Sequence, residues 1–335
     1  MNNFASAPIP IHHGRGKFQI FQDVSSESTG GQLSPQPQLS PSPPSFVSSE
    51  DHVVSRIGNY VLLEEVAPKV NKCIDTLNNK ECICKVVDVD KYREAFAVHF
   101  HLGYHPHINH VEEVLHGQSQ AYVILPITHG DMHSYVRRKR KLREREAASL
   151  FHQMVQAVAH CHAHGVILRD LKLRKFVFKK EERTDVVLDG IEEGRMLATP
   201  SDDNLNDKHG CPAYVSPEIL LTNGSYSGKA ADMWSLGVIL YTMLVGRYPF
   251  HDSDPVSLFT KIRLGQYNVP DSLSTQAKSM IYSLMRVSPT ERLTAEEVLE
   301  HPWFRTTSQK SSRKSEPKMV DQLVPDFFST DDDLT

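Results

Sequence analysis

The hydrophobic pattern of this chain changes once, near Gly130, and the change limits the folds available to it. Before it, short β-branched runs are typical of strands: "YVLLEEV" (60–66), "ECICKVVDVD" (81–90) and "QAYVILPI" (120–127). A helical stretch, "DKYREAFAVHFHL" (90–102), lies between the last two. After Gly130, long runs with helical periodicity dominate, such as "ADMWSLGVILYTMLVG". Strands followed by helices predict an α+β fold with a small β-rich lobe and a larger α-helical lobe.

Two polar segments flank this folded region. The first is rich in Ser, Pro, Gln and Gly, as in "LSPQPQLSPSPPS", and the last is again polar. Such segments bury too little apolar surface to offset chain entropy, so we expect both to be disordered. The predicted organisation is a disordered segment at 1–57, a folded domain at 58–304 and a disordered tail at 305–335. The lobes of the domain are expected at about 58–127 and 128–304.

Composition excludes several classes of protein. The chain has 37 basic and 41 acidic residues and a net charge of −4, which argues against a nucleic-acid partner. No apolar run approaches the ~18 residues of a membrane span, and the N-terminus lacks the apolar part of a signal peptide. Five cysteines at scattered positions suit reduced thiols better than a disulfide framework. We therefore expect a soluble intracellular protein that binds no membrane.

Several short motifs follow the order found in protein kinase domains. "ICKVV" places Lys85 where kinases carry their strand lysine, and "LRDLKLRK" places Asp170 at the catalytic base. "CPAYVSPE" resembles the Ala-Pro-Glu segment and ends at Glu218, whose expected partner is Arg292. "DMWSLG" places Asp232 where it would hold the backbone of the catalytic loop. Each motif is weak alone, but their order predicts a protein-kinase-like two-lobed fold.

The groups that a kinase uses on nucleotide phosphates are mostly replaced. Phosphoryl transfer depends on positioning and on Mg²⁺, yet "LEEVAPKVNKCID" (63–75) has no glycine where the glycine-rich loop should be. The metal-binding Asn is replaced by Lys175, and Asp-Phe-Gly by Gly190-Ile191-Glu192. We therefore predict a pseudokinase with no catalysis, no metal and no cofactor. Its vestigial kinase positions are Lys85, Asp170, Lys172, Lys175, Gly190, Ile191 and Glu192.

The surviving kinase residues allow two interpretations. They serve local hydrogen bonds, or they retain some nucleotide binding, which would make the chain an atypical metal-independent kinase or a weak ATP-binding regulator. The sequence does not assign the carboxylate that should pair with Lys85, and Glu94 is the nearest candidate. Asp189 precedes the Gly-Ile-Glu triplet, but one residue along a strand end should turn its side chain to the other face.

Two further patterns are ambiguous. Histidines gather in "HFHLGYHPHINH" (99–110) and in "HCHAHG", but no Cys-x-x-Cys pair accompanies them, and we favour packed histidines over zinc. The basic run "RRKRKLRER" (137–145) lies in a stretch expected to be helical from 131 to 165. It is either a docking or nuclear-import patch or a solvated helix face.

The segments "LRDLKLRKFVF", "DKHGCPAYVSPEIL", "HPWF" and "DQLVPD" together resemble the Tribbles pseudokinases, over about residues 60–326. The usual Tribbles triplet is Ser-Leu-Glu, whereas this chain has Gly-Ile-Glu. In "DQLVPD", a Val-Pro pair with acids on both sides has the form of a linear docking peptide.

The resemblance implies a scaffold of the nucleus and cytoplasm that modulates MAP-kinase signalling. Its pseudokinase domain would hold a degradation substrate such as a CCAAT/enhancer-binding-protein transcription factor. The constitutive-photomorphogenesis ubiquitin ligase would bind Asp321, Gln322, Leu323, Val324, Pro325 and Asp326. MAP-kinase kinases would bind His301, Pro302, Trp303 and Phe304.

Overall fold

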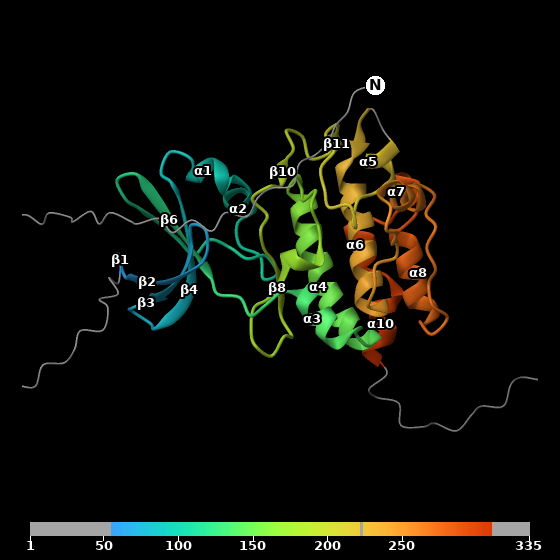
Figure 1. The fold of residues 1–335 in the computed structure, drawn as a ribbon, viewed down its shortest axis with the longest axis horizontal. Coiled ribbons are helices and arrows are strands. Elements are labelled where there is room, and N and C mark those ends of the chain that lie inside the picture. The colour runs from blue at the N-terminus through green and yellow to red at the C-terminus, as the bar shows by residue number, and fades with distance from the viewer. Residues whose placement is uncertain (1–54, 222–223, 310–335) are drawn as a thin grey trace, which may run out of the picture. The chain divides into compact units, whose positions relative to one another are not determined.

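The computed structural model describes residues 55–221 and 224–309 (Figure 1). The expected disorder of residues 1–54 and 310–335 lies outside these ranges. The prediction is wrong for Arg56 and Ile57, which form strand β1. The last helix, α10 (Pro302–Gln309), extends beyond the expected domain end at 304. No helix among the described residues has the length and apolarity that crossing a membrane requires.

Within the described residues the β-rich lobe forms one antiparallel six-stranded sheet, in the order β1-β2-β3-β4-β6-β5 (Figure 1). Its strands are β1 (Arg56–Ile57), β2 (Tyr60–Ala67), β3 (Val70–Asp75), β4 (Lys80–Asp88), β5 (Glu113–His116) and β6 (Gln120–Pro126). The predicted helical stretch forms two short helices, α1 (Tyr92–Ala95) and α2 (Ala97–Leu102). They separate at Phe96, whose ring is buried with Val123 and Leu125 of β6.

The second lobe is mostly helical, as predicted. Its helices are α3 (Met132–Lys139), α4 (Glu144–Ala163), α5 (Pro217–Leu221), α6 (Gly228–Val245), α7 (Pro255–Arg263), α8 (Thr275–Leu284), α9 (Ala295–Leu299) and α10. Short pairs of strands accompany them: β7 (Val166–Ile167) with β10 (Arg195–Met196), β8 (Phe176–Phe178) with β9 (Val186–Leu188), and β11 (Asn204–Leu205) with β12 (Tyr226–Ser227). Single 3₁₀ turns are η1 (Leu173–Lys175) and η2 (Pro289–Glu291).

Local sequence sets the helix ends. Asp131, Ser227, Asp254 and Ser274 each accept a hydrogen bond from a first-turn amide of the helix that follows, as N-caps do. Gly246 ends α6 in the left-handed conformation at φ 83°, where glycine carries no steric penalty. These short-range signals explain why the boundaries are legible in the sequence.

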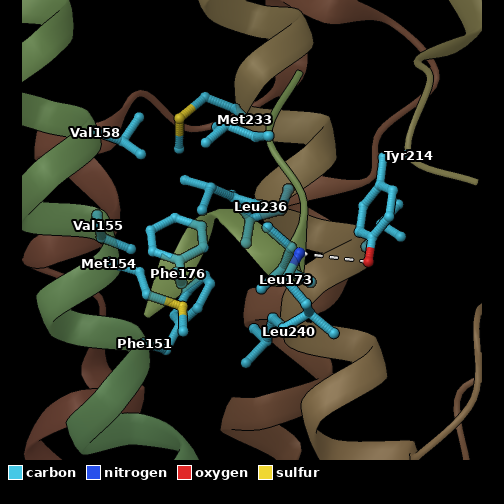
Figure 2. Packing of buried hydrophobic residues seen from close by; sticks show 14 of the residues in the cluster. Phe151, Met154, Val155, Val158, Leu173, Phe176, Tyr214, Met233, Leu236 and Leu240 are labelled. Carbon is cyan, nitrogen blue, oxygen red and sulfur yellow. Dashed lines mark hydrogen bonds between the residues drawn. The ribbon is translucent and has the colours of Figure 1, made fainter. Parts of the chain in front are cut away.

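The core of the helical lobe lies between α4 and α6 (Figure 2). Phe151, Met154 and Val158 of α4 point toward Leu236 and other apolar side chains of α6. The segment that carries η1 and β8 runs between these two helices and contributes buried side chains to the same cluster. The kinase-like loop is therefore built into the core, which fixes the groups that it presents.

The expected continuous helix over 131–165 is wrong at one point. α3 ends at Lys139 and α4 begins at Glu144, and the basic run spans the turn between them. Arg140 takes a positive φ of 70°, and the amide of buried Leu142 donates to Met243 O at 2.8 Å. Anchoring the turn against α6 breaks a helix that periodicity alone would continue.

Candidate functional site

The loop between β7 and η1 presents Asp170, and a buried aspartate fixes the backbone of this loop. Asp232 of α6 is 1% exposed and accepts hydrogen bonds from the amides of Leu168 at 2.8 Å and Arg169 at 2.9 Å. His162 Nε2 lies 2.9 Å from the same carboxylate. The predicted role of Asp232 is confirmed. A buried carboxylate with three partners is costly to disturb, so the loop is held firmly.

Asp170 lies between two ammonium groups. Lys172 Nζ donates to Asp170 Oδ2 at 2.5 Å, and Lys175 Nζ lies 3.9 Å from the same oxygen. Asp170 itself is buried, and the Lys175 side chain is largely covered. In a kinase the position of Lys175 carries an asparagine that binds Mg²⁺. Here a fixed cation of the protein stands close to the carboxylate instead.

The triplet that replaces Asp-Phe-Gly begins with a turn. Gly190 has a φ of 66°, which few other residues adopt, and Ile191 is buried in the core. A Cβ placed on Gly190 would lie 4.0 Å from both Lys175 Cε and Glu192 Oε2. The Lys175 and Glu192 side chains therefore both reach the space beside Gly190.

Asp189, one residue earlier, is held by a different group. Asn109 Nδ2, in the loop after α2, donates to Asp189 Oδ1 at 3.1 Å. The Asp189 amide donates to Lys175 O at 2.7 Å. The structure thus pairs this carboxylate with the small lobe's loop, as expected for a side chain on the other face.

Lys85 pairs with Glu192. Lys85 Nζ donates to Glu192 Oε1 at 2.5 Å, across 107 residues of sequence. The buried His99 ring of α2 lies 3.6 Å from the same oxygen, and Lys85 Nζ lies 5.8 Å from the Phe96 ring centre. The candidate Glu94 is exposed on α1, and within the described part of the chain it forms no ion pair with Lys85. The sequence predicted Glu192 only as a vestigial position, and this pairing was missed because no kinase motif places a partner for Lys85 there.

The environment of Glu192 keeps its carboxyl group charged. Burial raises the pKa of Glu192, but contacts with His99 and with the Lys85 ammonium lower it by more. The net effect is a pKa well below the usual value of 4.5. A charged glutamate is therefore ion-paired with Lys85, the lysine that a kinase directs at nucleotide phosphates.

The segment in the place of the glycine-rich loop is a hairpin of β2 and β3. Its turn contains Lys69, at a φ of 61°, whose amide donates to Glu65 Oε1 at 2.8 Å. Glu64 pairs with Lys72 across the hairpin at 2.5 Å. Acidic and bulky side chains thus stand where kinases bring bare backbone amides to the phosphates.

The histidine clusters form stacked rings. His105 stacks on His160 at 4.6 Å between ring centres, and His160 lies 4.1 Å from His164. Burial and the neighbouring histidines lower the pKa of His105 to about 4, so the ring is neutral at physiological pH. Among the described residues no group of three or more His, Cys, Asp or Glu side chains is arranged to hold a metal ion.

Comparison with known proteins identifies the fold and the family. Residues 66–304 match the protein kinase domain family. The chain is 53% identical to Tribbles homolog 2 of Bos taurus over 97% of this chain and 96% of the relative. It is 50% identical to Tribbles homolog 1 of Homo sapiens, over 83% and 75%. It is 46% identical to Tribbles homolog 3 of Mus musculus, over 92% and 88%.

The chain belongs to the Tribbles family. The kinase-like fold, with its β-rich first lobe and helical second lobe, is thereby confirmed. The residues that sequence reasoning selected around the cleft are brought together: Lys85, Asp170, Lys172, Lys175, Gly190 and Glu192 form one continuous group.

The predicted ion pair of the helical lobe is also present in this Tribbles-family fold. Arg292, with a fully buried side chain, donates to both carboxylate oxygens of Glu218 at 2.6 and 2.7 Å. The same guanidinium donates to three backbone carbonyls, among them Ala230 O at 2.8 Å. This fork ties the first turn of α5 to the residue that follows η2.

The "HPWF" segment starts α10, and its side chains are unequally accessible. Trp303 is fully buried, and its Nε1 donates to Glu144 Oε2 at 3.3 Å. Phe304 packs against Phe151 and against His152 of α4. His301 is half-buried and Pro302 is exposed. Binding of MAP-kinase kinases stays a prediction, and the buried Trp303 ring joins α10 to the core.

The predicted ligase-binding residues 321–326 lie outside the described part of the chain, so their assignment stays a prediction.

Proposed function

We propose that this Tribbles-family protein is a pseudokinase scaffold that transfers no phosphate. One observation carries the proposal: the protein's own side chains pair with the groups that would bind nucleotide and metal. Glu192 forms an ion pair with Lys85, and Lys172 and Lys175 both lie within ion-pair distance of Asp170.

The charge arrangement opposes magnesium chemistry. A kinase brings two Mg²⁺ ions to oxygen ligands on its catalytic loop and on Asp-Phe-Gly. Here those positions carry an ammonium group, at Lys175, and no side chain, at Gly190. Like charges a few ångströms apart repel by about 4 kcal/mol or more at the effective dielectric of a protein surface. Loss of the stabilisation by metal also raises the activation barrier, and each ~1.4 kcal/mol of barrier lowers the rate tenfold, so the rate falls by several factors of ten.

The scaffold role is inferred from the tail and from the family. The segment 321–326 would recruit a ubiquitin ligase of the constitutive-photomorphogenesis type, as a linear peptide that needs no folded context. The domain would hold the substrate, such as a CCAAT/enhancer-binding-protein transcription factor, and the HPWF end would dock MAP-kinase kinases. We place this activity in the nucleus and cytoplasm.

Two measurements on the full chain test the proposal. The first measurement is ligase binding: Val324→Ala with Pro325→Ala should weaken it by at least ~2 kcal/mol and leave the melting temperature unchanged. The second is a reconstituted ubiquitination of a CCAAT/enhancer-binding protein. The matched cleft variant, Lys85→Ala with Glu192→Ala, removes both partners of one ion pair and leaves no buried charge alone. With this variant as scaffold, the ligase should ubiquitinate the substrate near the wild-type rate.

A measurement of phosphate incorporation could contradict the proposal that the protein transfers no phosphate. If the chain phosphorylates itself or a peptide with Mg²⁺, and Asp170→Ala abolishes that activity, the protein is a kinase. If the tail variant binds ligase as tightly as wild type, the assignment of residues 321–326 is wrong.

A second function, weak metal-independent nucleotide binding, is favoured by one feature of the cleft. Lys85, Lys172 and Lys175 outnumber the carboxylates of Asp170 and Glu192, so the group carries a net positive charge that suits phosphates. ATP would have to displace Glu192 from Lys85. A thermal-shift titration with ATP separates the two functions: stabilisation without Mg²⁺ that is lost in Lys85→Ala supports a nucleotide-binding regulator.

A further inference from the structure

A polar cavity of about 430 Å³ lies in the segment that follows the Gly190-Ile191-Glu192 triplet. It is lined by β10, by the chain from β10 to Asp207 and by Arg169 of the loop after β7. None of its lining residues belongs to the group around Lys85 and Asp170. The functions proposed above therefore leave this cavity without a role.

Arg169 is held firmly in the wall of the cavity. Its backbone takes a positive φ of 64°, and its amide donates to the buried Asp232 carboxylate at 2.9 Å. Its side chain is 17% exposed and forms an ion pair with Asp207. Its Nε is buried and has no hydrogen-bond partner among the described residues. Because a guanidinium has five N–H donors, Arg169 keeps donors for a further acceptor.

A second arginine brings charge that no carboxylate neutralises. Arg195 lies on β10 and is exposed, and it forms no ion pair within the residues that the structure describes. Lys229, in the first turn of α6, lies beside the same segment, where its Nζ donates to Pro200 O at 2.9 Å. The cavity therefore has one fixed and one unpaired guanidinium, with an ammonium group nearby.

Two carboxylates also line the cavity, and one of them can be displaced. Asp202 Oδ1 accepts a hydrogen bond from the side-chain amide of Asn204 at 2.8 Å. Asp207 is the ion-pair partner of Arg169, but 49% of its side chain is exposed. Water already hydrates and screens an exposed carboxylate, so a stronger anion can replace Asp207 on Arg169 at little cost.

The segment itself supplies a hydroxyl group that can become such an anion. Thr199 lines the cavity and is exposed, and its side chain forms no hydrogen bond in the described part of the chain. Pro200 follows it, and the Asp202 amide donates to Thr199 O at 3.0 Å, which closes a turn with proline at its second position. A threonine followed by proline, on an exposed turn, is the acceptor pair of proline-directed protein kinases.

We propose that Thr199 is a phosphorylation site whose phosphate binds Arg169 and Arg195 in this cavity and displaces Asp207. A proline-directed kinase would transfer the γ-phosphoryl group of ATP to Thr199 Oγ1. The new P–O bond forms as the bond to ADP breaks, and the hydroxyl proton passes to the base of that kinase. The phosphate carries about −1.5 to −2 charges at pH 7 and three acceptor oxygens, against a single charge on Asp207. Arginine binds phosphate through two parallel hydrogen bonds, which are among the strongest in proteins.

The modification would change what Arg169 holds. In the structure Arg169 is tied to Asp207, the second residue after β11. With phosphate on Thr199, the same guanidinium would be tied to the turn between β10 and β11. The Asp207 carbonyl would keep its hydrogen bond from Tyr226 Oη, at 2.9 Å, so the change is confined to this segment. This inference goes beyond the scaffold role and does not depend on it.

The first test asks whether Thr199 is modified. The full chain is incubated with ATP, Mg²⁺ and a purified proline-directed kinase of the MAP-kinase class, and phosphate is located by mass spectrometry. Thr199 should be phosphorylated, and Thr199→Val should lose that phosphate alone. No phosphate on Thr199 in the folded chain would reject the site. Phosphate that appears there without the added kinase would confirm the site and contradict the absence of phosphoryl transfer proposed above.

The second test asks where the phosphate lies, by a ³¹P NMR titration of the phosphorylated chain. Two guanidinium groups favour the dianion, so the pKa of the phosphate should fall at least about 0.5 below its value near 6 in a phosphorylated peptide of residues 194–206. Arg195→Gln should remove most of this fall. Asp207→Asn should enlarge it, because it frees Arg169 from its partner. Arg286→Gln, which changes an exposed arginine outside the lining, is the matched control and should leave the pKa unchanged.

A thermal melt and a second phosphate position complete the design. The phosphorylated chain should melt about 2 °C or more above phosphorylated Thr199→Val, a comparison that cancels phosphate on the Ser-Pro sites. Phosphate installed on Ser201, which is exposed and outside the lining, should titrate as in the peptide. A pKa at Thr199 equal to that of the peptide, or unchanged by Arg195→Gln, would overturn the binding of phosphate in the cavity. An equal fall at Ser201 would reduce it to non-specific attraction and overturn it as well.

Discussion

Replacing Asp232 by alanine should destabilise the domain strongly. The carboxylate is 1% exposed and accepts hydrogen bonds from the amides of Leu168 and Arg169, and His162 Nε2 contacts the same oxygen as the Leu168 amide. Hydrogen bonds to a charged group contribute about 1.5–3 kcal/mol each, and a buried amide left without a partner costs about 1–3 kcal/mol. Breaking a buried charged network by removing one member typically costs about 3–5 kcal/mol. We expect that loss in the free energy of unfolding.

The assay is urea unfolding followed by far-UV circular dichroism, with a thermal melt as a second measurement. A loss of 3–5 kcal/mol corresponds to a fall of roughly 6–20 °C in the melting temperature of a domain of this size. Asp271→Ala is the control, because Asp271 is fully exposed in its pair with Lys278 and solvent screens that pair. A loss below ~1 kcal/mol for Asp232→Ala would refute the argument that this carboxylate anchors the loop.

Three other contacts of the fold give a prediction each. The pKa of Glu192 is lowered in the folded state, so its contribution to stability is present at pH values above its ordinary pKa of 4.5 and is lost as the pH falls through the folded-state pKa. Glu192→Gln should therefore reduce the dependence of the free energy of unfolding on pH at acidic pH. Arg292→Lys should cost at least ~2 kcal/mol in urea unfolding, because an ammonium cannot reproduce the two-pronged contact; full stability would contradict this. Gly246→Ala should destabilise more than Gly103→Ala, since both have positive φ but only Gly246 meets Arg140 O; equal melting temperatures would disprove the steric argument.

Much of the fold was predictable because its signals are local or follow a fixed order. Helix caps such as Ser227 and Asp254 act within one turn, and the strands before Gly130 have their own residue pattern. The pairing of Arg292 with Glu218 was also predictable, because the motif order of a kinase domain implies it. No comparable signal exists for a pair that the kinase pattern lacks.

The tertiary structure alone decided how the cleft is occupied. Lys85 pairs with Glu192, which is 107 residues away in the sequence, and not with Glu94 of α1, the helix that follows β4. The turn at Gly190 places Glu192 beside the lysine. The division of the basic run has a similar origin. Helical periodicity continues through Arg140, but the contact of this turn with the end of α6 breaks the helix. Sequence determines which side chains are available, and packing between distant elements determines which charges meet.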